Sequence, residues 1–77
     1  MIIYLKEAEK AIAKYDLATR QRIIEAVNRL PDGNIKPLKG KLNDFYRLRI
    51  GKYRIIFAIG EENYTIVDVD TRGDVYK

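Results

Sequence analysis

The segment at residues 46–59 constrains the fold most, because apolar and polar residues alternate along it on both sides of a glycine. Alternation with a period of two sends successive side chains to opposite faces of a strand. Gly51-Lys52 interrupts the pattern, and glycine at the first central position is typical of a two-residue type II′ turn. We therefore predict a β-hairpin with strands at residues 46–50 and 53–59. Its apolar row is expected to consist of Tyr46, Leu48, Ile50, Tyr53, Ile55, Phe57 and Ile59.

The opposite row of this hairpin carries three arginines, Arg47, Arg49 and Arg54. Because a tight turn fixes the register of its strands, we expect the three guanidinium groups to share one patch. A guanidinium is a planar fork that matches phosphate oxygens, so the patch suits a phosphate ligand. Arginines that alternate outward on an antiparallel strand are also ordinary solvent-facing residues. The alternation alone leaves both interpretations open.

The rest of the chain predicts two helices and two more strands. Residues 6–15 and 17–30 show helical spacing of apolar residues, with Asp16 placed to cap the second helix. Residues 31–34 end that helix, residues 36–41 form a basic loop, and residues 2–5 and 64–70 suit strands. This order predicts one α+β domain over residues 1–77, a small twisted, mainly antiparallel sheet (β-α-α-β-β-β) with a two-helix hairpin on one face. The other face is expected to stay open.

The composition limits the partners and the catalytic groups that the chain can use. The formal charge of +4 favours an anionic partner. With no histidine, acid–base catalysis must use other groups, and with no cysteine there is no thiolate metal site. We expect no metal and no cofactor. No apolar run approaches the roughly 20 residues that cross a bilayer, and the first residues do not resemble a signal peptide, so we expect a cytoplasmic protein without membrane contact.

The C-terminal segment adds two candidates for a catalytic site. Arg72 follows the last strand and Tyr76 lies four residues later, so both can reach the end of the arginine patch. Several arginines around one phosphorus would stabilise the charge of a transferring phosphoryl group. Nearby cations favour the tyrosinate, which could accept a proton from a ribose 2′-hydroxyl, as found in RNA. Alternatively, Tyr76 only packs its ring on the sheet edge.

Lysines around the hairpin are candidates for nucleic-acid binding. Lys36, Lys39 and Lys41 belong to the basic loop, and Lys52 lies in the turn. Their charge suits a polyanion, although loops commonly carry solvated lysines.

Taken together, these pieces resemble the RelE branch of the RelE/ParE toxin superfamily, the toxic partners of toxin–antitoxin modules. The likeness covers almost the whole chain and includes the helical hairpin, Leu38-Lys39-Gly40, the two arginine strands and the tail from Arg72 to Tyr76. It implies a small twisted sheet with two helices on one face. It also implies a cognate antitoxin, and cleavage of messenger RNA on the ribosome through attack of the 2′-hydroxyl, without a metal.

The resemblance also suggests roles for single residues. Arg54 and Arg72 match arginines that the family places around the scissile phosphate, and Tyr76 matches a tail tyrosine linked to proton abstraction or substrate orientation. Arg47 and Arg49 stand where well-known members have lysines, so we assign them to charge stabilisation, because arginine is a poor proton donor. Thr71 stands where many relatives have histidine. The general acid is left open, with Arg72 the family's usual candidate.

Two other functions fit the same fold. The ParE branch binds and poisons DNA gyrase and generally lacks the catalytic cluster. A catalytically silent module that binds RNA or protein is the other alternative.

Overall fold

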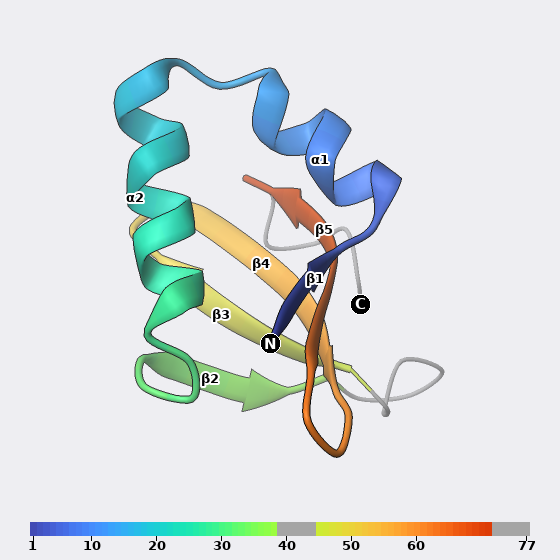
Figure 1. Cartoon of the computed structure of the whole chain (residues 1–77). Coiled ribbons are helices and arrows are strands. Elements are labelled where there is room, and N and C mark those ends of the chain that lie inside the picture. Colours follow the sequence, from blue (N-terminus) through green and yellow to red (C-terminus); the bar gives the residue numbers. More distant parts are fainter. Residues whose placement is uncertain (39–44, 72–77) are drawn as a thin grey trace.

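The computed structural model describes residues 1–38 and 45–71, which form two helices and a five-stranded sheet (Figure 1). The strands are β1 (Ile2–Tyr4), β2 (Asn34–Pro37), β3 (Tyr46–Ile50), β4 (Tyr53–Ile59) and β5 (Tyr64–Asp70), and the helices are α1 (Lys6–Ala13) and α2 (Leu17–Asn28). The sheet order is β1-β5-β4-β3-β2, with β1 parallel to β5 and all other pairs antiparallel. The predicted α+β class and mainly antiparallel sheet are confirmed.

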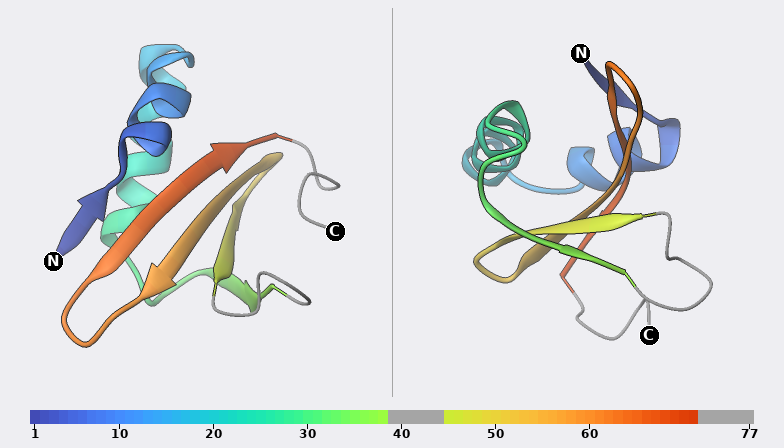
Figure 2. Two further views of the ribbon diagram at one scale, coloured as in Figure 1. Left: turned by 90° about the vertical axis from the view of Figure 1, so that its right-hand side faces the viewer. Right: turned by 90° about the horizontal axis from the view of Figure 1, so that it is seen from below.

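Both helices lie on one side of the sheet (Figure 2). Among the described residues no helix covers the other side, which we call the open face. The core between helices and sheet contains Ile23 and Val27 of α2 together with Leu48, Ile55 and Phe57 of the hairpin, all at most 2% exposed. Burying a large apolar side chain contributes about 1.5–3 kcal/mol, so these contacts hold the two layers together.

Local signals in the sequence explain where α2 begins and how the hairpin turns. The side chain of Asp16 accepts a hydrogen bond of 2.9 Å from the backbone N–H of Thr19, which confirms the predicted cap. Gly51 has a φ of +55°, and no described residue other than glycine has a positive φ. Lys52 therefore has a negative φ. This fits a type II′ turn and excludes a type I′ turn, in which the second central residue also has a positive φ.

The prediction of a loop at residues 36–41 is wrong for its first part, because Lys36 and Pro37 belong to the edge strand β2. Lys36 lies directly opposite Arg47, and Pro37 opposite Tyr46. Proline is tolerated on an edge strand, where its missing N–H leaves no hydrogen bond of the sheet unmade.

Ile59, which was predicted to belong to the apolar row of the hairpin, also departs from expectation. Its side chain is 51% exposed, since β4 ends in a turn that projects beyond the helices (Figure 1).

A β-bulge between β4 and β5 changes which side chains of β5 face the core. Ile56 pairs with Asp68, but the next residue, Phe57, pairs with Ile66, so Val67 is the extra residue. Ile66 and Val69 therefore both reach the core although they are three positions apart.

Candidate functional site

The structure brings the three predicted hairpin arginines together on the open face. Arg49 of β3 lies directly opposite Arg54 of β4, and Arg47 lies opposite Ile56. Their sequence neighbours Leu48 and Ile55 are buried in the helix-facing core, so alternation directs the arginines to the other side. The arginines differ in depth. Arg49 is exposed, Arg47 is partly buried, and Arg54 is only 7% exposed.

Arg47 has the electrostatic signature of an anion-binding group. Its Nη1 atom is buried and has no hydrogen-bond partner within residues 1–38 and 45–71. Burial lowers the pKa of Arg47 from its ordinary value, and the positive charges of Arg49 and Arg54 lower it further. The positive charge of Arg47 is thus less well stabilised in the free protein than the charge of a solvated arginine. An anion that accepted a hydrogen bond from Nη1 would relieve both the burial and the repulsion.

Two aspartates share the open face with the arginines. The bulge places Asp68 opposite Ile56 and Asp70 opposite Arg54, while Val69 between them faces the core. We name the set of Arg47, Arg49, Arg54, Asp68 and Asp70 the charged strip. Sequence reasoning missed its acidic half. A usable signal existed, since strict alternation from Ile66 would have put both carboxylates into the apolar core.

The predicted lysines fall in different places. Lys36 is exposed on β2, and because it lies opposite Arg47 it adds a further cation to the open face. Lys52 lies at the hairpin tip, where its Nζ atom is 5.6 Å from the ring centroid of Tyr53. Tyr53 packs edge-on against Tyr15 at 5.1 Å, so this lysine is drawn toward the helix side. Lys39, Lys41, Arg72 and Tyr76 lie outside the described residues.

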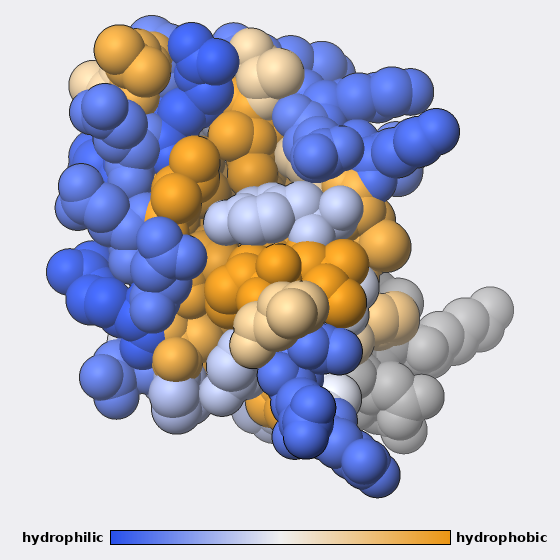
Figure 3. Space-filling view, viewed as in Figure 1, coloured by the Kyte–Doolittle hydropathy of each residue, from blue (hydrophilic) through white to orange (hydrophobic). Residues whose placement is uncertain are grey.

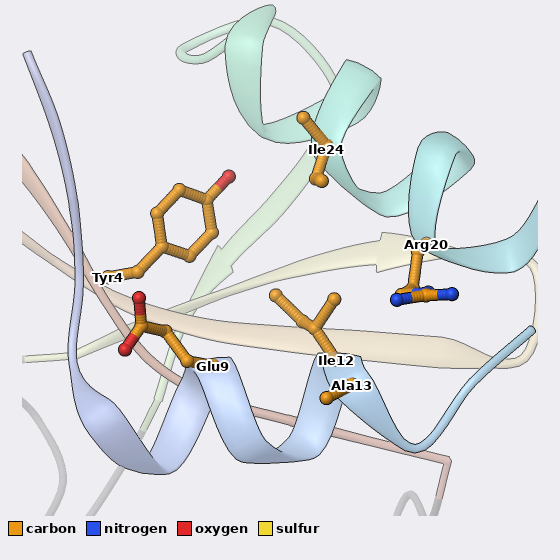
Figure 4. A pocket seen from close by; sticks show the side chains of 6 residues that line it. All are labelled: Tyr4, Glu9, Ile12, Ala13, Arg20 and Ile24. Atoms are coloured by element: carbon orange, nitrogen blue, oxygen red, sulfur yellow. The ribbon is translucent and has the colours of Figure 1, made fainter. Parts of the chain in front are cut away.

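A separate groove on the helix side was not anticipated. It measures about 320 Å³ and runs between α1, α2 and β1, with Ile12, Ala13 and Ile24 among its lining residues (Figure 4). A band of apolar surface is visible between α2 and β1 on this side (Figure 3). The hydroxyl of Tyr4 and the Nε atom of Arg20 line the groove, and neither has a hydrogen-bond partner among the described residues. Burial raises the pKa of Tyr4.

The described residues contain neither a cluster suited to a metal ion nor a helix suited to a membrane. Within residues 1–38 and 45–71 there is no group of three or more acidic side chains placed to hold a metal ion. Neither helix has the length and apolar character needed to span a bilayer.

Comparison with known proteins gives one family and a consistent set of folds. The family model described as "ParE toxin of type II toxin-antitoxin system, parDE" matches residues 2–76. No curated protein matches the chain. The RelBE2 toxin–antitoxin complex of Mycobacterium tuberculosis contains a chain that is 24% identical, with a TM-score of 0.82 and coverage of 94% of this chain and 96% of the other.

Two further solved structures share the fold. The RelB–RelE complex of Methanococcus jannaschii gives 22% identity and a TM-score of 0.77, covering 96% of this chain and 94% of the other. YafQ of Escherichia coli gives 12% identity and a TM-score of 0.72, covering 100% of this chain and 98% of the other. At these identities the structures show a common fold.

Proposed function

Because the chain belongs to the ParE toxin family of type II toxin–antitoxin systems, we propose that its open face cleaves messenger RNA on the ribosome without a metal ion. One observation carries the proposal. The Nη1 atom of Arg47 is buried without a hydrogen-bond partner among the described residues, beside two more arginines on the same face. This arrangement favours a bound phosphate over an empty site. RNA supplies a phosphate next to a nucleophilic 2′-hydroxyl.

The chemical step is an internal transfer at phosphorus. The 2′-oxygen forms a bond to the adjacent phosphorus, and the bond from phosphorus to the 5′-oxygen of the next nucleotide breaks. The products are a 2′,3′-cyclic phosphate and a new 5′-hydroxyl. Arg47, Arg49 and Arg54 stabilise the additional negative charge of the transition state. Tyr76 accepts the proton of the 2′-hydroxyl, and Arg72 is the candidate that protonates the leaving oxygen.

The ribosome supplies what this site lacks. Arginine stays charged over the working pH range and is a weak acid, and the chain contains no histidine. A site of fixed cations therefore depends on having the 2′-oxygen, the phosphorus and the leaving oxygen aligned by another body. Such alignment can account for much of a catalytic rate. The proposal accordingly places the protein in the cytoplasm, bound at the decoding site.

The test is to incubate the protein with programmed ribosomes and map the ends of the message by primer extension. Wild type is compared with Arg49→Ala, Arg72→Ala and Tyr76→Phe. Arg49 is exposed, so its removal should leave folding intact while lowering cleavage by about 10²–10³-fold. Arg22→Ala is the matched control, because Arg22 is an exposed arginine on α2. Intact messages in the presence of folded wild-type protein would refute the proposal.

Inhibition of DNA gyrase is the second candidate, and the description of the matching family as ParE toxin favours it. The two functions separate cleanly in a supercoiling assay. Loss of gyrase supercoiling at protein concentrations that leave ribosome-bound messages intact would support gyrase as the target. The arginine variants would then have no effect on message integrity.

We also propose that a cognate antitoxin covers the helix side of this protein. The relatives from Mycobacterium tuberculosis and Methanococcus jannaschii were solved as complexes with antitoxins. Here Ile24 lines the groove together with Ile12 and Ala13 and is 41% exposed. An exposed apolar residue in a groove between two helices suits a partner segment. Ile24→Glu should weaken neutralisation by the antitoxin, whereas Leu17→Glu, 61% exposed but outside the groove lining, should not.

A further inference from the structure

The charged strip is ordered in rows that cross the sheet. One row reads Arg49, Arg54, Asp70 across β3, β4 and β5, each residue directly opposite the next. The neighbouring row reads Arg47, Ile56, Asp68. Positive charge therefore lies on the β3 side of the open face and negative charge on the β5 side. Only the first row puts a carboxylate directly opposite an arginine.

The depth of Arg54 makes its partner important. A guanidinium with only 7% of its surface exposed is stable only when charged or polar groups compensate for lost water. Residues directly opposite each other in an antiparallel pair have Cβ atoms about 4.5–5.5 Å apart, well within reach of an arginine and an aspartate. Asp70 is partly buried, and both residues have an interaction partner in the structure. Arg49, opposite Arg54 on its other side, has the same charge and cannot fill this role.

Asp68 differs from Asp70 in a way that allows a matched comparison. It has the same side chain on the same strand and face, but it lies opposite the apolar Ile56. Its Oδ1 atom also accepts a hydrogen bond of 2.8 Å from the backbone N–H of Val69. Removing either charge should change the field over the face in a similar way, whereas only the removal of Asp70 should affect Arg54.

We propose that Asp70 is a positioning residue that holds the buried guanidinium of Arg54, and that the RNA phosphate therefore binds over β3, at Arg47 and Arg49. The second part rests on the proposed RNA cleavage. The two carboxylates repel a phosphate from the β5 side, and the pairing with Asp70 would fix Arg54 beside the bound phosphate, where it acts on the transition state. Arg47 and Arg49 are left to accept the incoming charge.

Lys14 is the competing partner for Asp70. It lines a groove of about 330 Å³ along the β5 edge together with Tyr15, Asp68 and Asp70. Burial and Tyr53 are the larger causes of the raised pKa of Tyr15, and the negative charges of Asp70 and Asp68 raise it further. Both carboxylates therefore lie near enough to this edge of β5 to act on Tyr15. Lys14 is exposed, and exposed ammonium groups pair only weakly. The experiment must nevertheless distinguish it from Arg54.

The first arm of the experiment uses the isolated protein and needs no activity. NMR measures the solvent exchange of the Arg54 guanidinium NH₂ groups, because the Nε atom has no hydrogen-bond partner among the described residues. Urea unfolding gives the midpoint of each variant. Asp70→Asn should speed the exchange and lower the midpoint, while Asp68→Asn should do neither. The effect of Asp70→Asn on the midpoint should disappear in an Arg54→Met background and persist in a Lys14→Met background.

The inference is overturned if Asp70→Asn and Asp68→Asn behave alike, or if the Asp70 effect vanishes with Lys14→Met instead. Should Arg54→Met fail to fold, the exchange rates of the two aspartate variants still decide between these outcomes.

The second arm measures cleavage on programmed ribosomes. Asp70→Asn should lower kcat on the order of 100-fold with KM unchanged or lower, because a misplaced Arg54 harms the transition state more than binding. Asp68→Asn should lower kcat by much less than Asp70→Asn, and Asp70→Glu should restore part of the loss. Equal losses for the two Asn variants would overturn the role of Asp70 in cleavage. If wild-type protein does not cleave RNA at all, the proposed function fails, but the first arm still tests the pairing of Asp70 with Arg54.

Discussion

At the scale of single residues, Arg47 combines a cost in stability with a proposed gain in function. Its buried Nη1 atom has no hydrogen-bond partner in the described part of the chain and lies beside like charges. Arg47→Met keeps an apolar stem of similar length and removes the charge. We expect the free energy of unfolding to stay level or rise by about 1 kcal/mol, while cleavage falls at least as far as in Arg49→Ala. Urea unfolding and primer extension on the same preparation would show whether stability and activity move in opposite directions.

Gly33 gives a second prediction at this scale. Its φ is +128°, which L side chains rarely adopt, and a Cβ there would lie 2.7 Å from Cδ1 of Leu48. Gly33→Ala should therefore destabilise the fold by about 1–3 kcal/mol, from backbone strain and displacement of a buried leucine. Gly60→Ala is the control, because its Cβ would meet only the carbonyl oxygen of Asn63 at an ordinary 3.5 Å. Equal unfolding midpoints for the two variants would contradict this account.

The sequence was informative about residues wherever local geometry decides their position. Period-two alternation predicted that Arg47, Arg49 and Arg54 share a face, and the Asp16 cap followed from local hydrogen bonding. The depth of Arg54 was not predictable in this way. Its burial depends on its place in the middle of the sheet, between strands whose order is a property of the tertiary fold.

At the scale of elements, β4 is the strand on which the two layers depend. Phe57 is fully buried and packs against the rings of Tyr46 at 5.8 Å and Tyr64 at 6.1 Å. Phe57→Ala should cost about 3–5 kcal/mol. A chain of 77 residues is expected to have only roughly 4–12 kcal/mol of stability in total, so this variant should lose a large part of it and unfold at a much lower temperature than wild type. Ile59→Ala, on the same strand but 51% exposed, should cost less than about 1 kcal/mol by thermal unfolding.

Strand β2 and the bulge in β5 show where element prediction from sequence stops. Residues 34–37 are too short and too polar to give an alternation signal, and Pro37 argues for a loop. They become a strand because β3 offers them a free edge. The bulge at Val67 likewise arises from pairing with β4, and it alone decides that Asp68 and Asp70 join the arginines.

At the scale of the whole molecule, the class of fold and the family could be predicted because the order of elements and the basic pattern extend over nearly the full chain.

Stability at high pH follows from features that only the structure shows. Burial first, and then Tyr53, Asp70 and Asp68, raise the pKa of Tyr15, and burial raises that of Tyr4. The folded state therefore holds these protons more tightly than the unfolded chain. Their contribution is complete below the unfolded pKa of about 10 and is lost as the pH rises through the folded values.

We thus expect unfolding midpoints in urea to fall as the pH is raised beyond about 10, when followed by far-UV circular dichroism. Tyr15→Phe should make this decline shallower, because one of the two shifted phenols is removed. A midpoint that stays level through this range, or a decline unaffected by Tyr15→Phe, would show that the burial of Tyr15 does not contribute as described.

The distribution of charge over the whole surface predicts how RNA binding responds to salt. The chain carries a net charge of +4, but only part of it lies on the open face, so net charge alone does not define the binding surface. Each phosphate neutralised on a single strand contributes about −0.7 to the slope of log K against log salt concentration. Contacts from Arg47 and Arg49 together predict a slope of about −1.4 for a short RNA measured by fluorescence anisotropy. Arg49→Ala should make that slope shallower by about 0.7, and Arg22→Ala, on the helix side, should leave it unchanged. If Arg22→Ala changed the slope and Arg49→Ala did not, RNA would be bound by the helices, and the open face would need another ligand.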